Sequence, residues 1–380
     1  MTGPGPETPD DPADTHAVPG SESSLAPGPA PVAPASGYAL GPWGPPLGHR
    51  DGSRAPGLFR FAIEGRRAPA LFVAGWIATV VGAGLALVGF LGGAGTGAAV
   101  LLLLGLALLS LGLVLLGGSQ AIERRAVGEA YAGPSPMLLF GAIIVVTIVV
   151  AGVVGTLLSL AGFTLPESDR PIGDLISVVI QGLVFVGLVR LMVVGTGAVS
   201  WREMGLAVPL PRAGAALLLG ASIAVPVILL TGLVAAAVSS LIPELPPSPL
   251  PPTGTASGLI LHLLAGSVVA PLAEETVFRG AMLTAWARTV GVRSAIVRSA
   301  ILFALAHALT VSGSSFGQAA GLAVVATVAR IPVALALGWI YARTGTLWAS
   351  IGLHATFNGV LILLSEVVPA APAALLLVVR

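Results

Sequence analysis

Residues 137–162 read MLLFGAIIVVTIVVAGVVGTLLSLAG, an apolar run without a charged side chain. A bilayer with a hydrocarbon core about 30 Å thick is crossed by a helix of roughly 20 such residues, so this run predicts a membrane span. Similar runs recur through most of the chain. Because a helix satisfies its own backbone hydrogen bonds in lipid, the sequence predicts an all-α, polytopic transmembrane helical bundle.

The lengths of the apolar runs predict about nine spans. They cover residues 69–93, 97–117, 137–162, 175–198, 213–241, 257–287, 294–310, 318–342 and 347–366. The connection between the first two runs is so short that these spans should form a helical hairpin.

We divide the chain into three parts on this pattern. Residues 1–60 are rich in Pro, Gly, Ser and Ala and predict a disordered tail, because such a segment buries too little apolar surface to offset its ordering entropy. Residues 68–242 hold the N-terminal transmembrane helices. Residues 257–366 hold most of the polar groups found inside spans and form the predicted core.

Arginine is concentrated in the tail and in every second connection between spans. The positive-inside rule therefore predicts a cytoplasmic N-terminus. These arginines include Arg66 and Arg67 before the first span, Arg124 and Arg125, Arg202 and Arg212, Arg288 and Arg293, and Arg343. The alternate connections are acidic, proline-rich or uncharged, which agrees with this orientation.

The composition excludes several classes of function. Only 9% of the residues are charged, and 18 basic against 17 acidic residues give a net charge of +1, so nucleic acid is not an expected partner. The chain has no cysteine, which excludes disulfides, thiolate metal sites and a cysteine nucleophile. All of its cations apart from histidine are arginine, so it offers no Schiff-base lysine.

Charged residues inside a span are candidates for function, because each costs about 2.5 to 3.5 kcal/mol at the centre of a membrane helix. Residues 271–280, PLAEETVFRG, place three of them in the sixth span. Glu275 and Arg279 are four residues apart on one helical face and can neutralise each other. Glu274 points in another direction without such a partner, so it is free to act as an acid or a base.

Two later spans add histidines with the same helical spacing. His307 follows Phe303 by four residues, and His354 precedes Asn358 by four. Each residue has a structural reading as well: a packing histidine, an interhelical hydrogen bond, or, for Glu275 with Arg279, a structural ion pair.

Taken together, however, a carboxylate, two imidazoles and an amide are the groups that peptide hydrolysis needs. In this interpretation Glu274 deprotonates a water that His307 positions. His354 and Asn358 then donate hydrogen bonds to the oxyanion.

Other interpretations of the same residues stay open. Glu274, His307 and His354 are possible zinc ligands, although His-Glu-x-x-His is absent and the three lie on separate helices, so we favour chemistry without a cofactor. A proton- or ion-coupled transporter would use the same buried groups as a relay. A third alternative is a noncatalytic scaffold or immunity protein. Arg330 and His262 are expected to have structural roles, and Glu366 no particular function.

The motifs in this order resemble those of the CPBP family, which contains the CAAX prenyl endopeptidases and bacteriocin-processing enzymes. They are Glu274-Glu275-x-x-x-Arg279, Phe303-x-x-x-His307 and His354-x-x-x-Asn358, and they span the predicted core. The resemblance implies an intramembrane catalytic cavity, with Glu274 as the base and with His307, His354 and Asn358 assisting. Glu275, Arg279 and Phe303 would support them.

The resemblance also implies a membrane-embedded or lipidated peptide as substrate. It leaves the metal open, because the family has been described both as metalloproteases and as glutamate proteases. The lysine-free composition, rich in Ala, Gly and Arg, is typical of a G+C-rich bacterial genome. Trimming of prenylated C-termini, the activity of the eukaryotic branch, is therefore the less expected of the family's activities.

Overall fold

The computed structural model describes residues 3, 55–93, 95–242, 250–309 and 311–367. Every helix in these ranges belongs to the unit that begins at Leu40. No strand occurs within the described ranges, and the predicted all-α membrane fold is confirmed. The predicted disordered tail lies outside the described residues, except for residue 3 and residues 55–60.

Four long helices form the N-terminal part of this unit. They are α1 (Pro69–Leu91), α2 (Thr96–Ala126), α3 (Pro136–Leu160) and α4 (Arg170–Val189), with the 3-10 helix Glu167–Asp169 before α4 and a π-helical turn, Arg190–Val194, after it. α1 and α2 form the expected hairpin, in which glycines let the two backbones approach closely. A Cβ atom at Gly82 would lie only 2.4 Å from the backbone nitrogen of Leu109.

The C-terminal part of the unit is also built entirely of helices within the described residues. Its helices are α5 (Leu210–Ser222), α6 (Ala224–Leu241), α7 (Ala256–Leu263), α8 (Ala270–Glu275), α9 (Thr284–Val290), α10 (Val292–Ala308), α11 (Phe316–Thr344) and α12 (Leu347–Val367). α5 and α6 are separated only by Ile223. α7, α8 and α9 form one continuous rod, because the π-helical segments Leu264–Val269 and Thr276–Leu283 join them.

Within the described ranges, eight stretches are long and apolar enough to cross a membrane. Eight of the nine predicted spans correspond to them. The exception is the prediction for 294–310, which corresponds to α10, a helix of 17 residues that includes Arg293 and Arg298. α10 is therefore a helix where one was expected, but it is shorter than the roughly 20 residues that a span needs.

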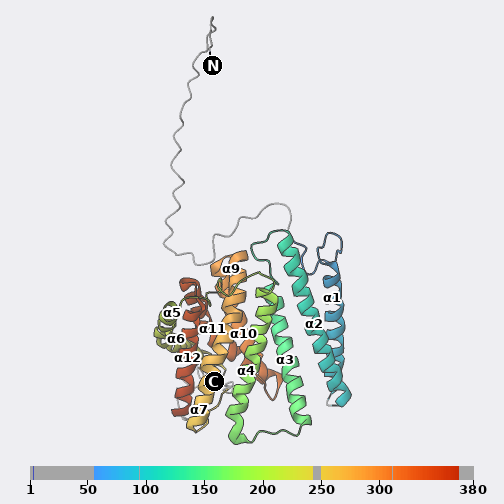
Figure 1. The fold of residues 1–380 in the computed structure, drawn as a ribbon. Coiled ribbons are helices and arrows are strands. Elements are labelled where there is room, and N and C mark those ends of the chain that lie inside the picture. The colour runs from blue at the N-terminus through green and yellow to red at the C-terminus, as the bar shows by residue number, and fades with distance from the viewer. Residues whose placement is uncertain (1–2, 4–54, 94, 243–249, 310, 368–380) are drawn as a thin grey trace. The chain divides into compact units, whose positions relative to one another are not determined.

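The long helices run side by side, so their connections gather at two ends (Figure 1). We call one of them the arginine-bearing end, because Arg124, Arg288 and Arg343 lie in the last turns of helices that finish there. Its connections are residues 127–135, 195–209, 291 and 345–346. The opposite end holds residues 161–166, 250–255 and 311–315.

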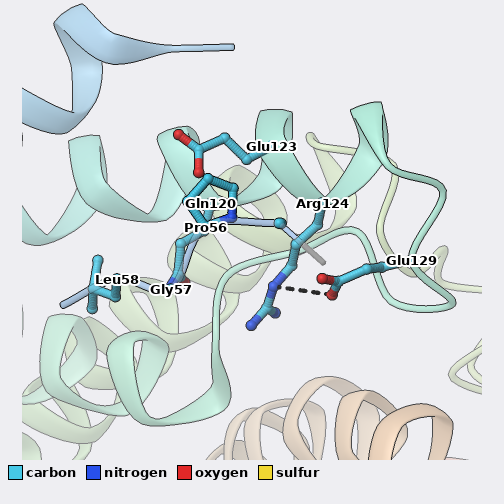
Figure 2. Close-up of a pocket in the computed structure, with 8 residues that line it drawn as sticks. Pro56, Gly57, Leu58, Gln120, Glu123, Arg124 and Glu129 are labelled. Atoms are coloured by element: carbon cyan, nitrogen blue, oxygen red, sulfur yellow. Dashed lines mark ion pairs between the residues drawn. The ribbon is translucent and has the colours of Figure 1, made fainter. Parts of the chain in front are cut away.

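The segment before α1 packs against the arginine-bearing end of α2. Figure 2 shows residues 56–58 beside Gln120 and Glu123, around a small cavity of about 70 Å³. Arg66 lies in the same region: its Nη1 is 2.9 Å from Glu123 Oε2, and its guanidinium lies 3.4 Å from the centre of the Phe72 ring. Arg66 is buried and is therefore a packing residue as well as part of the topology signal.

Candidate functional site

A cavity of about 650 Å³ lies within the helical bundle. Its walls come from α3, α4, α6, α8, α10, α11 and α12, together with the segment around Gly266. The structure brings the four predicted catalytic residues to this one cavity, although they are spread over three helical rods. These lining residues are Glu274, His307, His354 and Asn358, and Phe303 also lines the cavity.

Glu274 lies on α8, between the two π-helical segments. A π-helical turn shifts the side chains that follow it around the helix axis, and such turns are frequent at functional sites. The Oε2 atom of Glu274 is buried and has no hydrogen-bond partner among the described residues. His354 Nε2 is 3.9 Å from this oxygen. The carboxylate is therefore free to bind a water or a substrate group from the cavity.

His354 is held in a defined orientation by Glu275. The His354 Nδ1 atom is 2.8 Å from Glu275 Oε1, so Nδ1–H donates to the carboxylate and Nε2 is directed to Glu274. The edge of the Phe303 ring supports the imidazole, with ring centroids 5.6 Å apart. With Nδ1 protonated, Nε2 donates a hydrogen bond only when the ring is an imidazolium. The oxyanion role predicted for His354 therefore requires its charged form.

Glu275 and Arg279 form the ion pair that their spacing suggested, with 2.9 Å between Glu275 Oε1 and Arg279 Nη1. Both side chains are fully buried. Arg279 Nη2 also donates to the carbonyl oxygen of Ala334, and its guanidinium lies 4.5 Å from the centre of the Phe303 ring. The pair therefore joins α8 to α11 and α10 in addition to holding His354 on α12.

Ser350 is a supporting residue that the sequence analysis missed. Its hydroxyl donates to Glu275 Oε2 over 2.5 Å. Ser350 precedes His354 by four residues and so lies on the same face of α12, and this spacing is the signal in the sequence that points to it. Both oxygens of Glu275 are thus engaged, one by Ser350 and the other by Arg279 and His354.

His307 and Asn358 are each tied to a backbone carbonyl. His307 Nδ1 donates to the carbonyl oxygen of Phe303 over 2.8 Å, and the two rings are 4.7 Å apart. Asn358 Nδ2 donates to the carbonyl oxygen of Gly266 over 2.8 Å, which ties α12 to the first π-helical segment. An amide nitrogen carries two hydrogens, so Asn358 retains one for a group in the cavity.

Polar residues beyond the motifs also line the cavity, among them Arg330 on α11 and Asp174 and Gln181 on α4. Arg330 Nη1 donates to the carbonyl oxygen of Ala326 over 3.0 Å. His262, expected to be a packing residue, is buried with its Nε2 3.1 Å from Asp174 Oδ2. The role expected for His262 is therefore compatible with this contact between α7 and α4.

Glu366 has a structural contact where the sequence analysis expected none in particular. Its carboxylate accepts hydrogen bonds from the backbone N–H groups of Thr253 and Gly254. These bonds fasten the end of α12 to the segment before α7. Glu366 is therefore part of the framework at the opposite end of the bundle.

The possible zinc ligands do not form a metal site in this arrangement. Glu274 and His354 approach each other, but the described residues contain no group of three His, Cys, Asp or Glu side chains placed to hold a metal ion. We therefore derive no step of the reaction through a metal.

Residues 256–360 match the family model described as Rce1-like, type II CAAX prenyl endopeptidase Rce1-like. The match confirms the family resemblance that the three motifs indicated, and it supports a protease in general. All four candidate catalytic residues lie within the matched range. No curated protein and no solved structure gives a significant match to the chain.

Proposed function

We propose that the Rce1-like part of this chain is an intramembrane endopeptidase that hydrolyses a peptide bond of a membrane-associated or lipidated peptide. The observation that carries the proposal is that Glu274 lines the cavity while its buried Oε2 has no hydrogen-bond partner among the described residues and lies 3.9 Å from His354 Nε2. A carboxylate in this position is suited to accept a proton from a water in the cavity.

The proposed reaction needs no group beyond the chain and water. Glu274 accepts a proton from water as the water oxygen bonds to the carbonyl carbon of the substrate. The oxyanion that forms accepts hydrogen bonds from Asn358 Nδ2–H and from Nε2–H of the His354 imidazolium. Glu274 then returns the proton to the leaving nitrogen as the C–N bond breaks.

Glu275 supports this sequence as a positioning residue. Its carboxylate accepts the Nδ1–H hydrogen bond of His354 and stabilises the positive charge of the imidazolium. Arg279 neutralises Glu275 in turn, so the buried carboxylate stays ionised without an uncompensated charge. The proposed roles are thus divided: Glu274 handles the proton, and the Glu275–Arg279 pair holds the donor.

The arginine-bearing end is assigned to the cytoplasm, which makes the N-terminus cytoplasmic. Its support is the distribution of arginine over the connections, because positive residues favour the cytoplasmic side. The bilayer surrounds the long apolar helices, several of which expose large apolar side chains to their surroundings. The partner we expect, in addition to lipid, is the substrate peptide.

Hydrolysis can be tested by following the incorporation of an oxygen atom from labelled water into the cleaved product. The purified full chain, reconstituted in liposomes, is incubated with a membrane peptide library in water enriched in oxygen-18. We expect new peptide C-termini that carry one heavy oxygen, detected by mass spectrometry. Substrate binding without mass change would indicate a scaffold, and proton flux without cleavage would indicate a transporter.

Chelation tests the proposal that the reaction proceeds without a metal. We expect the cleavage rate to be unchanged after exhaustive treatment with a chelator followed by removal of the chelator. The measurement is the initial rate, with metal analysis of the treated protein to show that depletion is complete. A rate that falls on depletion and returns when zinc is added would contradict this proposal.

A further inference from the structure

Arg330 is a cation in the middle of a membrane helix. It lies midway between Phe316 and Thr344, the ends of α11, so roughly 20 Å of helix separates it from either end. The side chain is therefore too deep to place its charge among the lipid headgroups. Charged groups at this depth face the interior of a bundle or a cavity, and Arg330 lines the same cavity as Glu274.

The hydrogen bonds of Arg330 leave most of its donors available. Arg66 and Arg279, the fully buried arginines, each form an ion pair with a glutamate over 2.9 Å. Within the described residues Arg330 forms no such pair, and its one hydrogen bond runs from Nη1 to the carbonyl oxygen of Ala326 in the same helix. A guanidinium carries five N–H groups. The nitrogens of Arg330 that lack a hydrogen bond are not closed off by protein atoms, unlike Nε of Arg279.

A second donor lines the cavity from α6. Thr231 is only 2% exposed, and its hydroxyl has no hydrogen-bond partner among the described residues. α6 packs along α11, where Ala235 is buried against Val325 and Ala329. Thr231 precedes this contact by one turn of α6, and Arg330 is next to it on α11. The two donors therefore lie at similar levels of the bundle.

We propose that Arg330 and Thr231 form a subsite for a carboxylate of the substrate. The ligand class is a peptide that carries a carboxylate, either at its C-terminus or on an acidic side chain. This proposal rests on the proposed function in taking the occupant of the cavity to be the substrate, and it goes beyond the structural role expected for Arg330.

The chemistry of the two side chains matches this ligand. A guanidinium binds both oxygens of a carboxylate through two parallel N–H donors, and the threonine hydroxyl supplies a further hydrogen bond. The carboxylate of Asp174, which also lines the cavity, is already in contact with His262. A carboxylate of the substrate would thus satisfy two groups that the protein leaves without a partner.

Three labelled peptides test the subsite by binding. They share one apolar sequence with a single glutamine: the first ends in a carboxylate and the second in a carboxamide. The third ends in a carboxamide and has glutamate in place of the glutamine. Affinities are measured for the full chain in nanodiscs of uncharged lipid, with empty nanodiscs as the blank. The quantity compared is the affinity of each acidic peptide relative to that of the neutral second peptide.

We expect the wild-type chain to bind one of the acidic peptides about 10- to 100-fold more tightly than the neutral peptide, as for hydrogen bonds to a charged group. The peptide that is preferred identifies the source of the carboxylate. Arg330→Gln should abolish the preference. Arg330→Lys should retain part of it, because lysine keeps the charge but not the paired donors. Arg298→Gln, at an exposed position on α10, is the matched control and should leave it unchanged.

Thr231→Val tests the subsite without removing a charge. Valine keeps the shape of the side chain, and the hydroxyl has no hydrogen bond to lose among the described residues, so this variant should fold as the wild type does. We expect the preference for the acidic peptide to fall by about tenfold. An unchanged preference would remove Thr231 from the subsite.

Equal binding of the three peptides by the wild-type chain, or binding of none, would overturn the proposal. So would a preference that survives Arg330→Gln, or an Arg330→Gln variant that loses affinity for all three alike, as a purely structural role requires. Binding needs no catalysis. A preference without any cleavage would therefore retain the subsite and count against the proposed function, whereas cleavage without a preference would do the reverse.

Discussion

Replacing Glu274 with glutamine is expected to lower the cleavage rate by about 10²- to 10⁴-fold, the range typical for loss of a general base. Glutamine keeps the size of the side chain but does not accept a proton from water. The measurement is kcat for a peptide found to be cleaved by the reconstituted wild-type chain. Retention of the rate within a few-fold would show that Glu274 is not the base.

Two comparisons make this result interpretable. Glu64→Gln changes an exposed glutamate before α1 in the same chemical way and should leave the rate unchanged. The thermal unfolding midpoint of Glu274→Gln should be no lower than that of the wild type, because Glu274 Oε2 has no hydrogen bond to lose among the described residues. A variant that is folded and inactive thus identifies a chemical role. A transporter would instead lose proton movement without any peptide product.

The positions of the helices were accessible from the sequence because membrane thickness imposes a length on apolar runs. The run that opened the sequence analysis is α3, Pro136–Leu160. The breaks and π-helical segments within these helices could not be predicted from the sequence. Hydropathy does not record a change of hydrogen-bond register, so the break at Ile223 and the π-helical segments on either side of α8 gave no signal. The predicted span 294–310 is itself only 17 residues long and contains Arg298, so its length already falls short of a full crossing.

In the site, too, contacts within one helix could be predicted from the sequence, whereas contacts between helices could not. Spacing within one helix predicted that Glu275 would pair with Arg279, and it does. The hydrogen bond between Glu275 and His354 crosses 79 positions of sequence, and its formation depends on how α8 packs against α12. No pattern within either helix specifies that packing. The spacing within the helix thus predicts the structural pair of Glu275 with Arg279, but not the hydrogen bond by which Glu275 orients His354.

This dual role of Glu275 leads to a prediction about stability. Glu275→Ala should lower the free energy of unfolding by about 3–5 kcal/mol, because it leaves the charge of Arg279 buried without a partner. The measurement is reversible unfolding in detergent micelles. Glu64→Ala, at an exposed position, is the control and should change the free energy of unfolding little. A loss below about 1 kcal/mol would mean that Arg279 is compensated by other groups, such as the Ala334 carbonyl.

A double variant separates the structural role of Glu275 from its positioning role. Glu275→Leu with Arg279→Met removes both charges, and replacing a buried ion pair by apolar groups of similar volume is often neutral or stabilising. We therefore expect most of the stability to return. Cleavage should stay low, because His354 has lost the acceptor that fixed its Nδ1–H and the orientation of its ring. Full recovery of both stability and kcat would show that the pair acts only by holding the helices together.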